Sequence, residues 1–460
     1  MELGHFEADT DGKNFVFSFQ YPIGRVLDET FQASVVIIPL KETSARGISC
    51  KIHYSALDKT SRLLHMAIIS GYYNEIPLNT SDVVRKFKFN GNSVQPIDDT
   101  TIRIACDENV KVIAKMIDIN YGDIFLVPET SMAGKDYIVQ LPNSIEYENH
   151  IISISSIKGD FNGFNYAIYK NGHIIESGSN GGKNNSLTDL IIISDVEVPA
   201  QYTVVISSDR EVVLTVMSPQ MSPSLEIGKC ENGECGSDLG IYIAQPSASL
   251  NCNAWKTFEE RKMMDSEFSA VLAISPPLKK DCSYQFGLIH KKSTQDIIED
   301  NSLLETMGLR IDMEEDEQMF LSSKDGSFKT VRFGGIRTNY TNNLIGSFMH
   351  FVPSINEYIT GETIFHLPNY ECVLEVYTTL DTFLSDCYFD SEKLDSKLTS
   401  VDHFADIEGN YIKMILNLHG YIGIHDFFSP GKYISYVICK NVGGPNTAIG
   451  YVTGFDKIKA

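Results

Sequence analysis

The residues of this chain best suited to acid–base or metal chemistry gather towards its C-terminal end: His403, Asp406, Glu408, His419, His425 and Asp426. Imidazole and carboxylate side chains can share a metal ion or transfer a proton. The same stretch is also typical of half-buried strands with acidic turns, because apolar residues alternate with the polar ones. The order of these residues matches no known metal-ligand set or catalytic triad. We therefore expect no catalytic, cofactor-binding or metal-binding residue here, and no cofactor.

Other motifs that carry chemistry are absent from the sequence. There is no Gly-x-Ser-x-Gly elbow for a serine nucleophile. The glycine pairs 181–182, 334–335 and 443–444 lack the strand–loop–helix context of a phosphate-binding loop. We expect all three pairs to form turns.

Nine cysteines is an odd number, so at least one is unpaired within the chain. Cys230 and Cys235 flank a turn-forming Glu-Asn-Gly-Glu segment, and we predict that they form a small disulfide ring. Two interpretations of the remaining cysteines stay open, buried free thiols or an extracellular disulfide set, and we favour the second. These cysteines are Cys50, Cys106, Cys252, Cys282, Cys372, Cys387 and Cys439.

Composition limits the partners of the chain. Its 460 residues carry a formal net charge of −22, which argues against nucleic acid and anionic membranes, since both attract basic surfaces. No apolar segment is long enough to span a membrane. The first residues have neither a basic nor an apolar region typical of a signal peptide. Sequons at Asn79, Asn184 and Asn339 permit secretion without showing it.

Strand signals dominate the secondary structure. Short β-branched or aromatic runs are bounded by Gly, Asp, Asn or Pro throughout the chain. Asn171–Gly172 between two such runs predicts a tight hairpin, and a segment around Asp325–Gly326 predicts a second one. Only the segments 255–264 and 294–307 read as helices.

One sequence motif occurs twice in the chain. A strand ending in Val-Pro is followed by a turn and then by a strand ending in Leu-Pro, first over residues 122–143 and again over 346–369. The spacing between copies is 225 residues from Pro128 to Pro353 and 226 from Pro142 to Pro368. Proline ends each strand because it cannot donate to the ladder. We therefore predict two equivalent hairpins in two related halves of the chain.

Two weaker echoes support an internal repeat. The segment 198–206 resembles the segment 429–438. The segment Ile104–Val112 resembles Ile206–Leu214, and both of these predict a hairpin that turns at an aspartate. These features predict an all-β fold of two related antiparallel β-sandwich-like halves, with a few short helices in the second half. We expect modules at 1–220 and 251–460, separated by a linker at 221–250 rich in Pro, Ser and Gly.

In several of these segments the chain resembles the N-terminal domain of the IgG Fc-binding protein family. The resemblance rests on the Gly-x-x-Phe strand at Gly12–Phe19, the Gly-x-x-Tyr strand at Gly134–Tyr137, the two strand–turn–Val units already described, and the segment 431–455. It is best over 12–218 and looser over 251–455. No cysteine-dense von Willebrand D-type module accompanies it. The resemblance implies a secreted protein, although no signal peptide is present in this chain, and it does not imply that the chain binds IgG.

These observations favour a secreted, non-enzymatic binding or adhesion module. Its strands and loops would be presented to an extracellular protein or glycan, with no nucleic acid partner and no membrane insertion. The alternative is a β-rich hydrolase or metal-dependent enzyme that uses the C-terminal histidine and aspartate residues. A pocket joining His403, Asp406, His425 and Asp426 would favour the enzyme. For a binding module, we expect partner binding to survive replacement of His403 and His425 by alanine.

Overall fold

The computed structural model covers the whole chain. It describes residues 7–458 apart from 25–26, 28–29, 45, 90, 92, 145–148, 159–162, 182–186, 195–199, 223–237, 248–259, 277, 279–284, 293–294, 303–307, 315–316, 324–327, 338–343, 380–385, 395–397 and 406–409.

One arrangement of antiparallel strands occurs four times along the described chain, and we call each copy a module. In modules 1, 2 and 4 one central strand pairs with the first, second, third and last main strands, and in module 3 two strands share this role. In all four modules the fourth main strand pairs with the third, and the fifth with the second. The first and third strands pair with the first half of the central strand, and the second and last strands pair with its second half. The central strand therefore joins two layers of a β-sandwich.

In module 1 the central strand is β7 (Thr101–Ile117). Its partners and their extensions are β1 (Gly12–Ser18), β2 (Gln32–Pro39), β3 (Ile48–Ser55), β4 (Ser61–Ile68), β5 (Glu75–Pro77) and β8 (Gly122–Val127), with the short helix α1 (Thr80–Val83) after β5.

In module 2 the central strand is β15 (Tyr202–Ser222). The other strands are β9 (Gly134–Gln140), β10 (Asn143–Ser144), β11 (His150–Ser156), β12 (Phe164–Lys170), β13 (His173–Asn180), β14 (Leu187–Ile193) and β16 (Asp238–Ala244), preceded by the 3-10 turn η1 (Thr130–Met132). Strand β6 (Val94–Asp98) comes from the module 1 segment but pairs with β14.

In module 3 two strands take the place of the central one, β22 (Gln318–Ser323) and β23 (Lys329–Arg337), so the two layers are separate sheets. The other strands are β17 (Glu260–Asp265), β18 (Ser269–Ser275), β19 (Gln285–Lys292), β20 (Gln295–Ser302), β21 (Leu309–Asp312) and β24 (Leu344–Phe351).

In module 4 the central strand is β31 (Gly423–Lys440). The other elements are the 3-10 turn η3 (Ile355–Glu357) and the strands β25 (Ile359–Leu367), β26 (Cys372–Thr379), β27 (Tyr388–Phe389), β28 (Glu392–Lys393), β29 (Leu398–Ala405), β30 (Asn410–Asn417) and β32 (Ala448–Val452).

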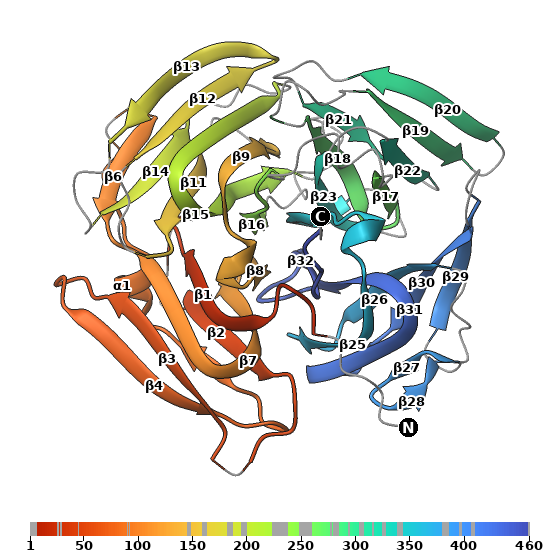
Figure 1. The fold of residues 1–460 in the computed structure, drawn as a ribbon, viewed down its shortest axis with the longest axis horizontal. Coiled ribbons are helices and arrows are strands. Elements are labelled where there is room, and N and C mark those ends of the chain that lie inside the picture. The colour runs from red at the N-terminus through yellow and green to blue at the C-terminus, as the bar shows by residue number, and fades with distance from the viewer. Residues whose placement is uncertain are drawn as a thin grey trace.

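The four modules form a ring in chain order, from red and orange through yellow and green to blue (Figure 1). The last strand of each module lies at the centre, where β8 contacts β16, β16 contacts β24, β24 contacts β32, and β32 contacts β8. The two ends of the described chain meet and close the ring. The backbone N–H of Thr10 donates to the carbonyl of Phe455 at 3.2 Å, and buried Lys111 binds both Asp11 at 2.7 Å and the carbonyl of Thr453 at 2.5 Å.

One carboxylate ties the central strands together. Asp238 of β16 is 1% exposed and accepts backbone N–H groups from a strand of every module. Its Oδ1 accepts from Gly122 at 3.0 Å and Leu239 at 2.8 Å, and its Oδ2 accepts from Ser347 at 3.4 Å and Ala448 at 2.9 Å. A short side chain thus satisfies buried donors that the separate sheets leave unpaired.

Hydrophobic cores cross the seams between modules. The cluster within module 1 continues into module 2 through Val213 and Leu239, and the module 2 cluster continues into module 3 through Val271 and Phe333. The largest cluster joins modules 3, 4 and 1. No module therefore buries a core made only of its own residues, and we infer that the four modules stabilise one another.

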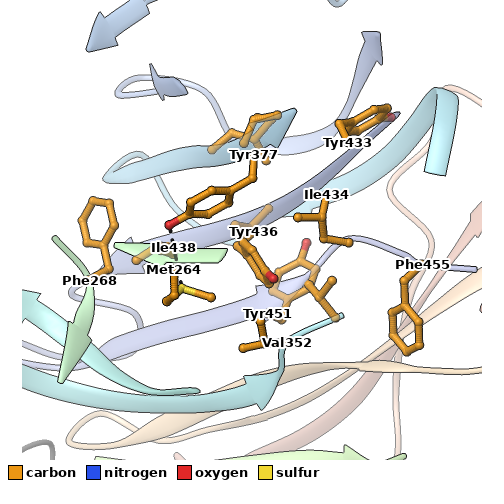
Figure 2. Close-up of a cluster of buried hydrophobic side chains, with 14 of the residues drawn as sticks. Met264, Phe268, Val352, Tyr377, Tyr433, Ile434, Tyr436, Ile438, Tyr451 and Phe455 are labelled. Atoms are coloured by element: carbon orange, nitrogen blue, oxygen red, sulfur yellow. Dashed lines mark hydrogen bonds between the residues drawn. The ribbon is translucent and has the colours of Figure 1, made fainter. Parts of the chain in front are cut away.

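The seam between modules 3 and 4 also buries charge. Figure 2 shows Tyr377 of β26 directed at Met264 of β17, with their Oη and Sδ atoms 3.8 Å apart. Beside them, Arg332 of β23 binds Glu375 of β26 with an Nη1–Oε2 distance of 2.6 Å, and both side chains are fully buried. Such a pair costs desolvation energy unless its geometry is well satisfied. Here Nη2 of Arg332 adds a second bond to Glu375 at 3.3 Å, and Tyr377 adds a third by donating to Glu375 at 2.8 Å.

The all-β, antiparallel sandwich-like fold class is confirmed. The Asn171–Gly172 hairpin is confirmed as well, since β12 and β13 pair across it and both residues have positive φ, 50° and 78°. The second predicted hairpin is wrong, because β22 and β23 flank it but belong to different sheets. The two predicted helices are also wrong where the structure describes them. Strands β17 and β20 occupy these segments because pairing with β22 and β19 outweighs the local helical pattern.

The repeated Val-Pro and Leu-Pro phrase has equivalent positions in the two halves, but it is not a hairpin. Residues 122–143 hold β8 and β9, which belong to the sheets of modules 1 and 2. Residues 346–369 hold most of β24 together with β25, which belong to modules 3 and 4. Proline after β8 and β24 marks the crossing from one module to the next. The repeat is therefore shorter than a half of the chain, and each half contains two modules.

The echo between Ile104–Val112 and Ile206–Leu214 is structurally equivalent, although neither copy is a hairpin. Both segments lie within a continuous central strand that bulges away from its partner. Gly12 of β1 pairs with Val110, and Gly134 of β9 pairs with Val212, each just beyond a register shift. A third bulge interrupts β31 between Ser429 and Tyr433. The aspartate turn in the sequence is thus a wide bulge that bends the central strand between layers.

Part of the predicted linker at 221–250 is ordered sheet. Asp238–Ala244 forms β16, which pairs with β15 and lies at the centre of the ring. The linker prediction is wrong for these residues, because the bonds of Asp238 go to distant strands that the local composition does not reveal. Residues 223–237, which include Cys230 and Cys235, lie outside the described residues, and their disulfide stays a prediction.

The charge state of Asp238 makes the stability of the ring depend on pH. Burial raises the pKa of Asp238 from 3.8 to about 7, although four backbone N–H groups offset part of this effect. An acid with a raised pKa in the folded state binds more protons folded than unfolded, so stability falls as pH rises from about 4 to 7. We expect a loss of about 4 kcal/mol over this range from Asp238, at 1.36 kcal/mol for each pKa unit.

Urea unfolding at pH 4.5 and 7.5 checks this expectation with Asp238→Asn. We expect Asp238→Asn to be less stable than the native chain at both pH values, because its amide NH₂ faces backbone donors. Its unfolding free energy should fall less between pH 4.5 and pH 7.5 than that of the native chain. Asp136→Asn is the control, because exposed Asp136 accepts one hydroxyl, that of Ser207, at 2.6 Å. Equal pH dependence in the native chain and Asp238→Asn would contradict the role of Asp238.

Candidate functional site

The structure separates the histidines of the sequence-predicted cluster. His403 lies on β29 opposite Ile412, and the ladder continues through Thr378 to Tyr433 of β31. His425 lies eight residues before Tyr433 on β31, beyond the bulge of that strand, so three strand pairings and eight residues of β31 lie between the two histidines. Asp406 and Glu408 lie outside the described residues.

His425 is instead held by a residue that the sequence did not indicate. Its Nδ1 lies 2.7 Å from Oδ2 of Asp390, and its Nε2 lies 3.2 Å from the carbonyl of Ile422. The imidazole stacks on Phe389 with ring centres 5.4 Å apart. Asp426 contributes its backbone N–H, which donates to Oδ1 of Asp390 at 3.1 Å. The side-chain contacts of His425 are thus with Asp390, Phe389 and the loop beside Ile422.

No group of three or more His, Cys, Asp or Glu side chains with metal-binding geometry occurs among the described residues. His419 lies in the loop before β31, where its backbone N–H donates to Asn417 at 3.0 Å. The structure thus distributes the predicted cluster over β29, the 418–422 loop and β31.

A different set of residues gathers where modules 1 and 4 meet. Four loops contact one another in series at this seam: 118–121 contacts 441–447, 441–447 contacts 368–371, and 368–371 contacts 418–422. A fifth loop, 69–74, reaches module 4 through Tyr73 and His366. We call these five loops together the tyrosine loop surface. They are rich in Gly, Tyr, Asn and Ile. Large side chains with about half or more of their area exposed lie on four of them, namely Ile119, Tyr72, Tyr73, Tyr370 and Ile422. A cluster of large exposed apolar and aromatic side chains is typical of a binding surface.

Tyr73 fixes the first loop to module 4. Its ring lies 5.1 Å from that of His366 on β25, and its hydroxyl lies 3.2 Å from Nε2 of His366. The same hydroxyl donates to Glu75, which Lys115 binds at 2.8 Å. Burial and the charge of Lys115 lower the pKa of His366 to about 3, so its imidazole is neutral at physiological pH.

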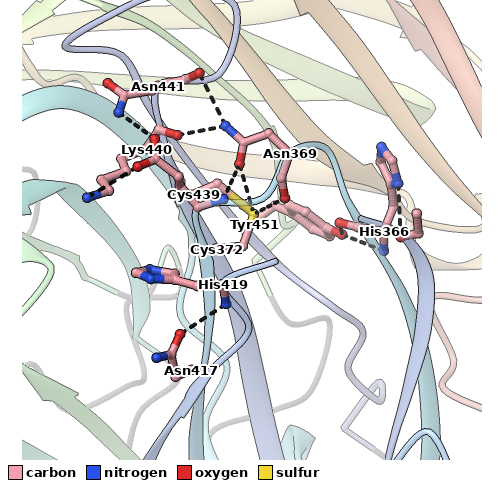
Figure 3. The surroundings of a disulfide bond; sticks show 11 residues. His366, Asn369, Cys372, Asn417, His419, Cys439, Lys440, Asn441 and Tyr451 are labelled. Carbon is pink, nitrogen blue, oxygen red and sulfur yellow. Dashed lines mark hydrogen bonds and ion pairs between the residues drawn. A yellow bond between two sulfur atoms is a disulfide. The ribbon is translucent and has the colours of Figure 1, made fainter. Parts of the chain in front are cut away.

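A disulfide and an asparagine hold the loops of module 4 (Figure 3). Cys372 and Cys439 are bridged across β26 and β31, at the point where both strands reach the surface. Asn369 donates to the carbonyl of Lys440 at 2.8 Å and to that of Asn441 at 3.2 Å. Between these anchors, the backbone carbonyl of Tyr370 accepts the N–H of Gly420 at 2.9 Å. The backbone of Tyr370 is therefore fixed while its side chain remains exposed.

Two glycines allow the 441–447 loop to lie directly on module 1. A Cβ on Gly443 would be 2.2 Å from the carbonyl oxygen of Asp118, and Gly443 has a φ of 88°. A Cβ on Gly444 would be 1.7 Å from the carbonyl oxygen of Ile119. Only glycine permits so close an approach of two backbones. The prediction of a turn at this pair is confirmed, whereas Gly334–Gly335 lies within β23, where Gly334 packs against Phe348.

The tyrosine loop surface has the composition of a recognition site. Tyrosine provides a large, amphipathic contact area at little cost in side-chain entropy, and Gly and Asn provide adaptable backbone and amide contacts. Of its turns, the sequence indicated the one at Gly443 and Gly444. The convergence of the loops depends on the meeting of modules 1 and 4, which local sequence does not encode.

The cysteines are partly resolved into pairs. Cys50 of β3 and Cys106 of β7 form a second disulfide, next to the bulge of β7. Cys387 is buried and forms no disulfide. The two disulfides are compatible with an extracellular protein. Among the described residues, no helix has the length and apolar character needed to cross a membrane.

No known protein family and no curated protein matches this chain. Among solved structures, it has a weak similarity to the two B repeat units (B1B2) of the collagen-binding protein of Staphylococcus aureus. That alignment covers 96% of this chain and 99% of the other, with 8% identity and a TM-score of 0.12. A similarity this low gives no basis for assigning a common fold or function.

The seam that carries the tyrosine loop surface is tested by Gly444→Ala. The added methyl group overlaps the carbonyl of Ile119, and we expect a loss of about 2–3 kcal/mol in unfolding free energy from overpacking. Urea unfolding measures this loss. Gly181→Ala is the matched control, because a Cβ there meets no atom within 4 Å. Equal stability of the two variants would contradict the direct packing of the 441–447 loop on module 1.

Proposed function

We propose that this protein is a secreted, non-enzymatic binding module that recognises an extracellular protein or glycan through the tyrosine loop surface. The observation that carries the proposal is that four loops of modules 1 and 4 contact one another at one seam, which the 69–74 loop joins through Tyr73 and His366. Tyr72 and Tyr370 are exposed there on a backbone fixed by hydrogen bonds and a disulfide. Loops held by a rigid sheet scaffold are the usual place for recognition residues.

The chemistry of the surface supports a binding role over a catalytic one. Its most exposed groups are aromatic and aliphatic, Tyr72 at 69% and Tyr370 at 58%. The titratable groups around Tyr73, namely Glu75, Lys115 and His366, bond to one another or to Tyr73. Exposed tyrosines suit a partner that offers both apolar area and hydrogen-bonding groups.

The relation to the IgG Fc-binding N-terminal domain family belongs to the same proposal. Its support is that the Gly-x-x-Phe segment at Gly12 and the Gly-x-x-Tyr segment at Gly134 occupy the same place, the first strand of modules 1 and 2, and pair with the same part of the central strand. The family resemblance names a fold pattern and a secreted setting, and it leaves the ligand open.

A capture experiment with matched variants tests the proposal. The native chain, a Tyr72→Ser/Tyr370→Ser variant and an Ile174→Ser/Ile175→Ser variant are immobilised and exposed to extracellular fluid, and bound material is identified by mass spectrometry. Ile174 and Ile175 are similarly exposed but lie on the edge strand β13 of module 2. We expect a ligand retained by the native chain and the isoleucine variant, with affinity for the tyrosine variant lower by ten- to a hundredfold, about 1.4–3 kcal/mol.

A ligand lost with the isoleucine variant and kept by the tyrosine variant would place recognition elsewhere. Stoichiometric zinc in the purified native chain, removed by replacing His403 and His425, would favour the metal-dependent enzyme.

A further inference from the structure

We infer that Asn79 is a site of N-linked glycosylation, placed at the opposite end of β5 from the 69–74 loop and its exposed tyrosines. Asn79, Thr80 and Ser81 form a sequon between β5 and α1, and Asn79 and Ser81 are both exposed. This inference rests on the proposed extracellular role, because N-glycans are added in the secretory pathway.

The side chain of Asn79 is not used by the fold. Asn79 precedes the first turn of α1, where an asparagine side chain ordinarily accepts a backbone N–H of the helix. Here it accepts none. The backbone carbonyl of Asn79 takes the N–H groups of Asp82 at 2.9 Å and Val83 at 3.2 Å instead. Replacement or modification of this side chain therefore leaves the helical turn intact.

The two side chains that define the sequon, those of Asn79 and Ser81, are in contact. The hydroxyl of Ser81 donates to Oδ1 of Asn79 at 2.7 Å, and no described residue accepts a hydrogen bond from Nδ2 of Asn79. The amide nitrogen thus faces solvent. In the transfer, Nδ2 loses one proton to a base of the transferase and forms a bond to the anomeric carbon of an oligosaccharide. The bond from that carbon to its lipid pyrophosphate carrier breaks, and the pyrophosphate leaves with the electron pair.

The position of Asn79 determines what a glycan would cover. The extended strand β5 separates Asn79 from Tyr73, and six residues of extended chain span about 20 Å. On the side of Asn79, exposed Leu57 lies beside α1, since its backbone N–H donates to Asp82 at 2.8 Å. A glycan on Asn79 would shield this apolar side chain and leave the 69–74 loop at the other end of β5 accessible.

The test directs the full chain into the secretory pathway of human cells with a heterologous signal peptide. Peptides from cells and medium together are analysed by mass spectrometry before and after enzymatic glycan removal, so retention inside the cell does not hide the result. We expect most native molecules to carry a glycan on Asn79, and the Ser81→Thr variant to carry it at least as often. The modification is expected to disappear in Asn79→Gln and Ser81→Ala.

Thr80→Pro is the sharpest variant. It keeps Asn79 and Ser81 but blocks the sequon, because proline is excluded from the middle position. The structure accepts it, since proline is favoured at the first helical position. Asn79 has an extended backbone, with φ of −67° and ψ of 106°, and so avoids the α region that a following proline disfavours. We expect Thr80→Pro to fold like the native chain, with an unchanged urea midpoint, and to lose the glycan completely.

An unmodified Asn79 in natively folded chain from this pathway would overturn the inference, as would a glycan that persists in Thr80→Pro. The outcome is separable from that of the proposed function. A glycosylated chain that captures no ligand contradicts only the binding role, and an unmodified chain that captures a ligand through Tyr72 and Tyr370 contradicts only the glycosylation site.

Discussion

The carboxylate of Asp238 is the constraint on which the arrangement of the modules depends. Four modules that each end in a short central strand bring backbone N–H groups together in a place without water, and strands from separate sheets do not satisfy one another. Asp238 accepts one N–H from each module, through Gly122, Leu239, Ser347 and Ala448. Removal of this acceptor leaves four buried donors unpaired, each at a cost of about 1–3 kcal/mol.

From this centre the functional geometry follows outwards. Because the ring closes, with Thr10 bonded to Phe455, module 4 lies against module 1. That contact brings the 441–447 loop onto the β7–β8 turn through Gly443 and Gly444, and it places Tyr73 on His366. The tyrosine loop surface is thus a product of ring closure and belongs to neither module alone. A binding site built in this way is lost whenever the seam opens, even if each sandwich keeps its strands.

Much of the fold could be predicted from particular residues. Asn171 and Gly172 adopt the positive φ that their hairpin requires, and Gly12 and Gly134 mark equivalent first strands. The prolines after Val127 and Val352 correctly end strands, but a proline does not reveal which sheet the next strand joins. Asp238 could not be found, since its partners are backbone groups more than a hundred residues away in three of four cases. The site was missed for a similar reason. Tyr370 has significance only beside loops from another module.

Hydrogen exchange at the backbone amides of Gly122, Leu239, Ser347 and Ala448 tests the central claim most directly. If Asp238 holds the four modules as one unit, these amides are exposed in the same opening event, despite their separation in sequence. The account predicts one common free energy of opening for all four, lowered together in Asp238→Asn. Four different opening energies, each shared with the rest of its own module and unchanged in the variant, would contradict it.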